Sequence, residues 1–374
     1  MFRRLAHTLP ADAVFEPDLA KLGFFVNEDD RVRSIRSPDR KFQYKINRND
    51  RWNEVHKSAI RHIISDRLAN LGCETVRLPL GAAESDNHVP ILVSKDCTTK
   101  SRVTVFFGER NMEPGVLSWR IIGEEGIKHG SLVEFTKALL SVPVLETSPM
   151  STSTSTSTST SASAAGLIVA NPCQLLWYRG GGRAVSPHEW LSLPRPSSVH
   201  DAPRVDNVKN RIPGNFDYVE HVSYMFEKVI PTLVDKEAKL DLVGLEYTGT
   251  AVLEYLAEHW DAWSGRINGI TLVTPQHKIA DLINNGASDG FITFVSKRCR
   301  AYFVSHSAIE TPIAGRDEFG CNCYASGEHA YTENAIARCW RHMLDWFNML
   351  YLNPEHEEVE FVVVKEDEEV KLGW

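Results

Sequence analysis

The sequence predicts an α/β fold with a mostly parallel central sheet and helices on both of its faces. Short continuous apolar segments, typical of strands that are buried on both sides, recur at Arg102–Gly108, Gly166–Pro172 and Ile267–Val273. Segments with apolar residues at helical spacing alternate with them, beginning with Asn49–Leu71. Because parallel neighbours need a long crossover connection, this alternation favours parallel strands joined by helices.

Each expected element rests on its local pattern. Strands are expected over residues 22–26, 42–46, 73–80, 102–108, 166–172, 240–245, 267–273 and 300–304. Helices are expected over residues 49–71, 131–140, 217–234, 250–260 and 331–350. Ser131 is expected to cap the second of these helices. Residues 177–215 are rich in Pro, Gly and Arg, so we expect an ordered excursion over an edge of the sheet there.

The expected elements fall into three parts. Residues 1–50 form a small β-rich lead-in, residues 51–350 form the α/β domain, and residues 351–374 form an acidic strand or tail around the apolar stretch Val359–Val364. A Ser/Thr repeat within residues 147–165 interrupts the main domain. Because such a repeat has no apolar side chains to pack, we expect it to be a disordered loop.

Composition excludes several classes of protein. The 374 residues are 43% hydrophobic and 24% charged, which is ordinary globular composition. The net charge of -8 argues against a broadly basic nucleic-acid binder, so contact with RNA would need a local patch or a partner. A chain of this length can bury roughly three quarters of its unfolded surface, so it needs no metal or disulfide to fold.

Cysteine spacing and hydropathy indicate the compartment. The seven cysteines are odd in number, scattered and without a CxxC pair, which favours free thiols in a reducing compartment over a zinc site. No apolar stretch of the length of a secretory signal follows the first basic residues, and no run of about 18 apolar residues is present. We therefore expect a nuclear or cytoplasmic protein with no metal, no cofactor and no membrane contact.

A hydrolase of the α/β type needs a nucleophile at a strand-to-helix turn, followed along the chain by an acid and a histidine. Fitting GxSxG to the turn after the 240–245 strand, with Gly249 as the last glycine, places Tyr247 at the nucleophile position. Leu245 then stands where the motif needs glycine, and a phenol is a poor acyl acceptor beside Ser or Cys. We therefore expect a turn without catalysis, although Thr248, one residue later, leaves a divergent hydrolase open.

An acid, a base and an oxyanion loop can still be placed on the sequence. Asp317 follows the 300–304 strand and His329 precedes the last helix, so Tyr247, Asp317 and His329 are interpreted as vestigial triad positions. Gly108 and Glu109 come at the end of the 102–108 strand, where hydrolases carry the N–H groups of an oxyanion hole. The carboxylate of Glu109 would oppose a developing oxyanion, so a plain strand-end turn is the simpler interpretation.

An aromatic and basic surface for a partner or RNA is expected between residues 177 and 211. Trp, Tyr and Arg dominate the energetics of protein interfaces. The expected surface residues are Trp177, Tyr178, Arg179, Arg183, Arg204 and Arg211. The glycine run at 180–182 lacks both GxGxxG and the P-loop lysine, so it does not predict a nucleotide site.

Several long blocks, in order along the chain, resemble the argonaute-binding protein 2 family, whose domain also occurs attached to class II histone deacetylases. The blocks are MFRRLAHTLPADAVFEPDLAKLGFFVNEDDRVRSI (1–35), FQYKINRNDRWNEV (42–55), FFGERNMEPGVLSWR (106–120), NRIPGN (210–215) and CNCYASGEHAYTENAIARCW (321–340). The likeness extends from residue 1 to about residue 350, and the Ser/Thr repeat stands outside it as an insertion.

The resemblance implies an α/β-hydrolase-like fold and a role in chromatin silencing. Family members act with argonaute in a small-RNA chaperone complex that supports heterochromatic histone methylation, or as the accessory domain of a deacetylase. With no deacetylase domain in this sequence, the likeness favours a non-catalytic subunit or scaffold of a nuclear RNA-silencing complex. Its implied partners are argonaute and a chaperone-complex subunit, with RNA contacted indirectly. A divergent esterase or amidase and an accessory partner of a histone deacetylase are the alternatives.

Overall fold

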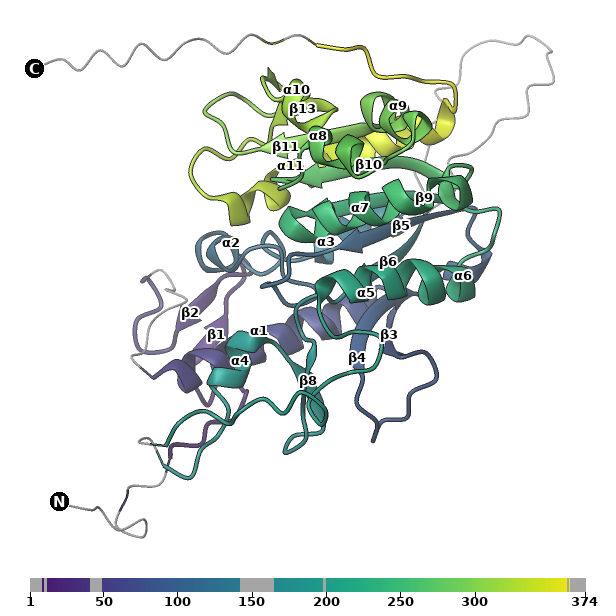
Figure 1. Cartoon of the computed structure of the whole chain (residues 1–374). Helices are drawn as coiled ribbons and strands as arrows, with labels where there is room; N and C mark the ends of the chain where they lie inside the picture. The colour runs from purple at the N-terminus through teal and green to yellow at the C-terminus, as the bar shows by residue number, and fades with distance from the viewer. Residues whose placement is uncertain are drawn as a thin grey trace, which may run out of the picture. The chain divides into compact units, whose positions relative to one another are not determined.

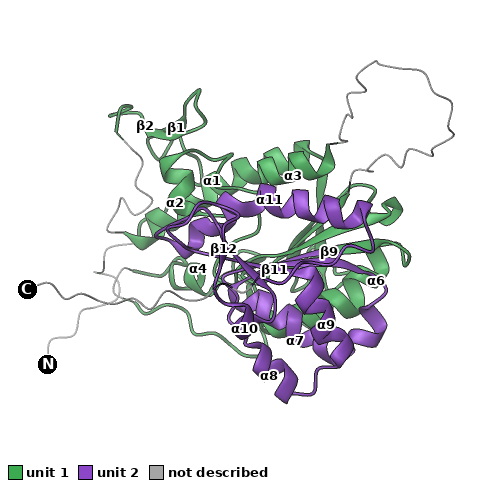
Figure 2. Ribbon diagram, turned by 90° about the horizontal axis from the view of Figure 1, so that it is seen from above, with its two compact units in different colours: residues 1–240 green, residues 241–374 purple. Residues whose placement is uncertain are grey.

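The computed structural model describes residues 9, 12–40, 49–141, 165–197, 200–361 and 363. The chain separates into two compact units, Met1–Leu240 and Asp241–Trp374, which Figure 2 distinguishes by colour. This division differs from the three parts that the sequence predicted. Strands and helices alternate in both units, so the predicted α/β class is confirmed. The expected strand at 42–46 and most of the Ser/Thr insertion lie outside the described residues.

Unit 1 combines a mixed sheet with two small hairpins (Figure 1). Its elements are β1 (Phe24–Val26), β2 (Val32–Ser34), α1 (Asp50–Asn70), β3 (Cys73–Leu78), β4 (Val89–Ser94), the 3₁₀ turn η2 (Cys97–Thr99), β5 (Arg102–Phe107), α2 (Trp119–Glu124), α3 (Val133–Leu140), β6 (Gly166–Ala170), β7 (Leu176–Tyr178), β8 (Arg183–Val185), α4 (Pro187–Leu191), α5 (Tyr218–Tyr224), the π-helical turn η3 (Met225–Val229) and α6 (Ile230–Leu233). The main strands follow the order β5-β6-β4-β3. Strands β5 and β6 run parallel, whereas β4 pairs antiparallel with both β6 and β3.

The local sequence explains the main elements of unit 1. Every residue of β5 and of β6 is buried, in agreement with their continuous apolar pattern. Asn49 is the N-cap of helix α1, and its side chain accepts the N–H groups of Arg51 and Trp52. Its buried Ile60, Ile64 and Leu68 repeat every four residues and form one apolar face.

Unit 2 contains a second set of alternating strands and helices. Its elements are β9 (Lys239–Leu245), which begins at the end of unit 1, α7 (Glu246–Trp263), β10 (Ile267–Val273), α8 (Ile279–Asn284), α9 (Asp289–Arg298), β11 (Cys299–Phe303), β12 (Pro312–Ile313), α10 (Arg316–Phe319), β13 (Asn322–Ala325) and α11 (Thr332–Leu352). The strand order is β12-β13-β11-β10-β9. Strand β11 runs parallel to both β10 and β13, and the short β12 pairs antiparallel with β13. Figure 2 shows α11 on one side of the strands and α7 and α9 on the other.

Short elements and helix starts account for the differences from the sequence prediction. The strand β4 and the helices α2, α8 and α9 were not predicted, and residues 177–215 contain β7, β8 and α4. The prediction that Ser131 caps a helix was wrong. Leu132 occupies that position, and the Ser131 hydroxyl lies 3.5 Å from the amide nitrogen of Val133. Helix α7 begins at Glu246 rather than Thr250, directly after β9.

The C-terminal segment after α11 is fixed by one buried acid. Glu358 accepts hydrogen bonds from the Arg300 guanidinium at 2.5 Å and from Trp346 Nε1 at 2.8 Å. Its second oxygen accepts from the Tyr324 hydroxyl at 3.0 Å and from Asn322 Nδ2 at 3.2 Å. This acid is therefore part of the packing of unit 2 rather than of a solvated face, and the described residues from 355 onward form no strand.

Two glycines bring the end of β9 against the start of α7. A Cβ atom on Gly249 would lie 2.9 Å from the carbonyl carbon and oxygen of Gly244. A Cβ on Gly244 would lie 2.6 Å from the Cα of Gly249. Both obstacles are backbone atoms, which cannot rotate away, so the tight strand-to-helix turn depends on the missing side chains.

We expect Gly249→Ala to lower the free energy of unfolding by about 1–3 kcal/mol, because the added methyl overpacks a backbone contact. Urea denaturation monitored by circular dichroism measures the change. Gly265→Ala is the matched control, since nothing lies within 4 Å of its added Cβ. Equal midpoints for the two variants would contradict this account of the turn.

A buried histidine fastens α5 to the end of β6. The N–H of Asn171 donates to Nε2 of His221 at 3.0 Å, so Nδ1 carries the ring proton and donates to Asn215 Oδ1 at 2.6 Å. Burial lowers the pKa of His221 to about 3. The ring is therefore neutral in the folded protein at every pH at which the protein would ordinarily be handled.

His221 should make stability depend on pH. Its folded pKa lies below the unfolded value of about 6.5, so the stability it contributes is present above pH 6.5 and is lost as the pH falls toward 3. In His221→Gln, the decline of the unfolding free energy from pH 6.5 to 4.5 should be shallower by about 1 kcal/mol per pH unit. Urea titrations across this range test it, with exposed His129→Gln as control. Identical slopes for wild type and His221→Gln would exclude the assignment.

Candidate functional site

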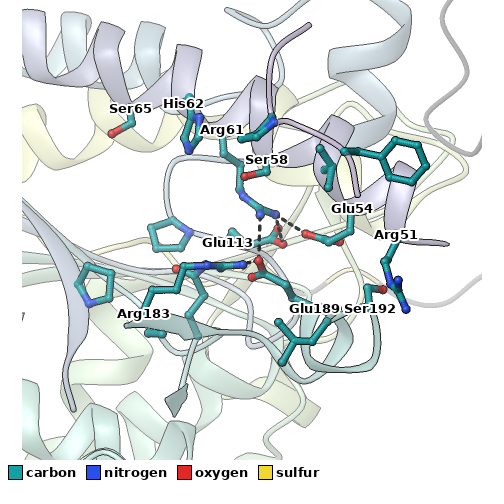
Figure 3. A pocket seen from close by; sticks show the side chains of 18 of the residues that line it. Arg51, Glu54, Ser58, Arg61, His62, Ser65, Glu113, Arg183, Glu189 and Ser192 are labelled. Atoms are coloured by element: carbon teal, nitrogen blue, oxygen red, sulfur yellow. Dashed lines mark hydrogen bonds and ion pairs between the residues drawn. The ribbon is translucent and has the colours of Figure 1, made fainter. Parts of the chain in front are cut away.

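A cavity of about 600 Å³ within unit 1 is the main candidate site (Figure 3). Its walls come from the segment at residues 13–17, α1, β3, β4, β8 and the residues that follow α4. Apolar surface makes up most of the wall, although about half of the lining side chains are polar or charged. The apolar side chains include Phe15, Val55, Leu68, Leu92 and Leu193. Pockets that bind small molecules in proteins have this size and this mainly apolar lining.

A buried arginine with three carboxylates forms the polar side of the cavity. Figure 3 shows Arg61 projecting from α1 toward these acids. Its Nη1 lies 2.8 Å from Oε1 of Glu54, which is two turns earlier on the same face of α1, and 2.7 Å from Glu113 Oε1. Its Nη2 lies 3.7 Å from Glu189 Oε1 on α4. These four residues are called the Arg61 cluster below. The cluster joins three segments: helix α1, the residues that follow β5, and helix α4.

Glu189 has a second cation but also an unused oxygen. Its Oε1 lies 2.5 Å from Nη1 of Arg183 on β8. Its Oε2 is buried and has no hydrogen-bond partner among the described residues. Ser186 orients this acid, because its hydroxyl caps α4 by accepting the Glu189 N–H at 3.0 Å. The Ser186-Pro-His-Glu189 spacing marks a helix start in the sequence, but not the direction in which the Glu189 carboxylate points.

The cluster perturbs the ionisation of its members in different directions. Burial raises the pKa of Glu189, and the attraction of Arg61 and Arg183 only partly offsets this. Burial also disfavours the charge on Glu54, but Arg61 and Lys57 more than compensate, so the pKa of Glu54 is lowered. For Arg61, burial is outweighed by Glu113, Glu54 and Glu189, which raise its pKa. Arg61 therefore stays charged, and burial raises the pKa of Glu189 despite its two arginine neighbours.

The segment at residues 12–17 is held across the cavity at one end. Asp12 forms an ion pair with Arg51 of α1 and accepts the backbone N–H of Arg195 at 3.1 Å. The following residues of this segment line the cavity, and Val14 among them is exposed. The guanidinium of Arg51 is thereby used to position the segment.

In the turn between β9 and α7, the elbow is the residue with the strained backbone, where a hydrolase carries its nucleophile. The residue found there differs from the one that the sequence suggested. Glu246 has a φ of 46°, in the left-handed region, whereas Tyr247 lies within α7 and is 40% exposed. The assignment of Tyr247 to the elbow was therefore wrong by one residue. Thr248 is fully buried, and its hydroxyl has no hydrogen-bond partner among the described residues. The sequence could not reveal this, because a glutamate carries no signal of a left-handed φ.

The predicted acid and histidine of the triad do not meet in unit 2. Asp317 is exposed on α10, and the side chain of His329 is 71% exposed. The carboxylate nearest to the His329 ring is that of Glu328, 3.9 Å from Nδ1. Glu328 itself accepts the backbone N–H groups of residues 329–331 ahead of α11. No hydrogen bond or ion pair joins Asp317 to His329 in the part of the chain that the structure describes.

The predicted oxyanion loop is a strand-end turn. Gly108 and Glu109 follow β5 directly, at the carboxyl end of a strand that runs parallel to β6. A carboxylate oxygen of Glu109 lies 3.3 Å from the Asn111 side-chain nitrogen. The acid is thus held by its own loop, and its charge opposes an oxyanion there.

The predicted partner surface between residues 177 and 211 is largely used inside the protein. Trp177 is only 3% exposed, and Tyr178 packs against the buried cluster of Leu176, Val185, Trp190 and Leu193, so neither is an open surface residue. The prediction for Trp177 was wrong because β7 turns this side chain inward. Strand β8, which pairs with β7, is labelled in Figure 1.

The four arginines of this predicted surface divide into two pairs. Arg183 is bound to Glu189, and Arg211 donates to the Phe216 carbonyl at 3.3 Å and to Asn207 Oδ1 at 3.1 Å. Arg211 also lies 3.9 Å above the ring of Phe216. Arg179 and Arg204 are exposed. Of the predicted set, Arg179 and Arg204 are therefore the arginines that are exposed to solvent outside these contacts.

The described residues contain no metal-binding cluster and no membrane-spanning helix. No group of three or more His, Cys, Asp or Glu side chains among those residues is arranged to hold a metal ion. All seven cysteines are buried free thiols. None of the helices in these ranges is long and apolar enough to cross a membrane.

Replacing Arg61 by Met should lower the free energy of unfolding at pH 7.5 by about 3–5 kcal/mol, because three buried carboxylates lose their shared cation. The loss should be smaller at pH 5, where the orphaned acids can take up protons. Urea denaturation at both pH values measures it. Arg77→Met, at an exposed residue 3.7 Å from exposed Glu84, is the matched control and should change stability by at most about 0.5 kcal/mol. A comparable loss in both variants would argue against a stabilising cluster.

Comparison with known proteins identifies the family. No curated protein matches the chain. Among solved structures, AbyA5 is similar over 82% of this chain and 78% of its own, with a TM-score of 0.35 and 12% identity. The structure titled "Crystal Structure of DphMB1" is similar over 74% of this chain and 84% of its own, with a TM-score of 0.28 and 12% identity. The family model described as "Arb2 domain" matches residues 15–309, which is most of the sequence. The protein belongs to the Arb2 domain family, as the resemblance of its sequence blocks indicated.

Proposed function

We propose that this protein is a non-catalytic subunit or scaffold of a nuclear RNA-silencing or heterochromatin complex. Membership of the Arb2 domain family supports an association with argonaute-related machinery in general. The more specific role rests on the resemblance to family members that act with argonaute in a small-RNA chaperone complex. Its partners would be argonaute and a further chaperone-complex subunit, with RNA bound through them.

The observation that carries a binding role over catalysis is the β9–α7 turn. An acyl-transfer enzyme of the α/β-hydrolase type presents a hydroxyl or thiol at this turn. Here the left-handed position is occupied by Glu246, and the nearest aliphatic hydroxyl, that of Thr248, is buried. The acid and the histidine predicted to complete a triad, Asp317 and His329, are not paired. These features together support a domain that binds rather than one that hydrolyses esters.

A divergent esterase or amidase is the second candidate, and the strain at Glu246 favours it. A non-glycine residue in the left-handed region costs roughly 1–3 kcal/mol and is found preferentially at functional sites. A carboxylate can also act as a covalent nucleophile. The third candidate, an accessory partner of a histone deacetylase, rests on the family resemblance alone.

Purification of the tagged full-length protein from its native cells tests the proposed role. We expect argonaute and small RNAs in the same eluate, detected by proteomics and RNA sequencing. Glu246→Gln should retain both, because binding does not require this carboxylate. Recovery of a histone deacetylase without RNA would support the third candidate instead, and recovery of neither partner would refute the silencing role.

Turnover assays on the purified protein separate the second candidate from the first. We expect no hydrolysis of ester or amide substrates above the rate of the uncatalysed reaction. Hydrolysis that is lost in Glu246→Gln and retained in Glu254→Gln, an exposed acid on the same helix, would favour the enzyme. That outcome would overturn the non-catalytic role.

A further inference from the structure

We propose that the cavity beside the Arg61 cluster binds a small organic monocation, an ammonium or amidinium group on an apolar body, with Glu189 accepting its N–H. The site lies entirely within unit 1 and is independent of the silencing role proposed above. Three features carry the inference. They are the lining of the cavity, the charge balance of the cluster and the unused oxygen of Glu189.

The lining of the cavity selects the body of the ligand. A volume of about 600 Å³ accommodates a small molecule, and most of the surface that lines it is apolar. Phe15 contributes from the segment at residues 12–17, while Val55 and Leu68 contribute from α1. The lining also contains the hydroxyl groups of Ser58, Ser65, Thr75 and Ser192. A compact aromatic or aliphatic body therefore suits these walls better than a heavily hydroxylated one.

The charge balance of the polar side selects the sign of the ligand. Three carboxylates lie beside two guanidinium groups, those of Arg61 and Arg183, and the ammonium group of Lys57 also attracts Glu54. The third arginine of the lining, Arg51, is paired with Asp12. An anionic ligand would therefore meet arginines that are already engaged and carboxylates that repel it. A monocation would be attracted by these carboxylates.

The unused oxygen of Glu189 locates the contact. Its side chain is only 4% exposed, and Oε2 has no hydrogen-bond partner among the described residues. Leaving a buried acceptor without a donor is unfavourable, so an N–H group supplied by a ligand would stabilise the complex there. Burial also raises the pKa of Glu189, and Arg61 and Arg183 offset this only in part. A bound cation would supply a donor to Oε2 and a charge opposite to that of the carboxylate.

Binding of benzylammonium to the full-length protein tests the proposal, with benzyl alcohol and benzoate as the neutral and anionic probes of similar shape. Isothermal titration calorimetry at pH 7.5 should give a Kd for benzylammonium at least about tenfold lower than that for benzyl alcohol, since one charged hydrogen bond contributes more than a neutral one. Benzoate should bind most weakly. Benzamidinium extends the test to a second cation.

Equal or tighter binding of benzyl alcohol or benzoate would overturn the proposal. Failure of both cations to bind at millimolar concentration would overturn it as well. In Glu189→Gln, which keeps the shape of the side chain, the preference for the cation over the alcohol should disappear. Glu237→Gln, at an exposed acid of the same unit, should keep the wild-type preference.

A second variant protects the test if Glu189→Gln does not fold. Ser65 is an exposed residue of α1 that lines the cavity and lies apart from the ion pairs of the cluster (Figure 3). Ser65→Trp should fill this side of the cavity and weaken benzylammonium binding at least about tenfold, while the thermal midpoint stays near the wild-type value. Wild-type affinity in a folded Ser65→Trp protein would place the cation elsewhere and refute the site.

Discussion

The burial of the Arg61 guanidinium is the constraint around which unit 1 is arranged. A charge removed from water is tolerated only where opposite charges and hydrogen bonds replace its hydration. Here the replacement comes from Glu54, Glu113 and Glu189, which belong to three separate segments of the chain. Satisfying one cation therefore fixes the relative positions of α1, the chain after β5 and α4, and the space left beside them is the cavity.

Local patterns predicted the parts of the fold whose causes are local. Strands β5, β6 and β10 are buried along their whole lengths, so their sequences are continuous apolar runs, and α1 shows its periodic buried face directly. The cluster could not be predicted in this way, because Arg61 and Glu189 are distant in sequence and each resembles an ordinary surface residue. The prediction that Trp177 is a surface residue was wrong for a related reason. An aromatic residue among arginines looks like an interface, whereas its burial is decided by the strand that carries it.

The β9–α7 turn shows how a motif can be read one residue out of register. Two glycines are present, and the spacing to Gly249 suggested Tyr247 as the elbow residue. In the structure the two glycines pack against each other, and the left-handed φ falls on Glu246 between them. A backbone angle has no signature in side-chain identity unless glycine occupies the position. The question of catalysis therefore depends on a conformation that the residue pattern alone could not supply.

Both units bury glutamates, and comparing Glu358 of unit 2 with Glu189 of unit 1 separates a structural acid from a candidate ligand site. Both oxygens of Glu358 are occupied, one by Arg300 and Trp346 and the other by Tyr324 and Asn322. Such an acid is complete within the protein, and its role is to hold the C-terminal segment. Glu189 has Arg183 on one oxygen and no donor among the described residues on the other. Since buried polar groups are almost always satisfied, the oxygen left open beside a cavity is where a missing donor is expected.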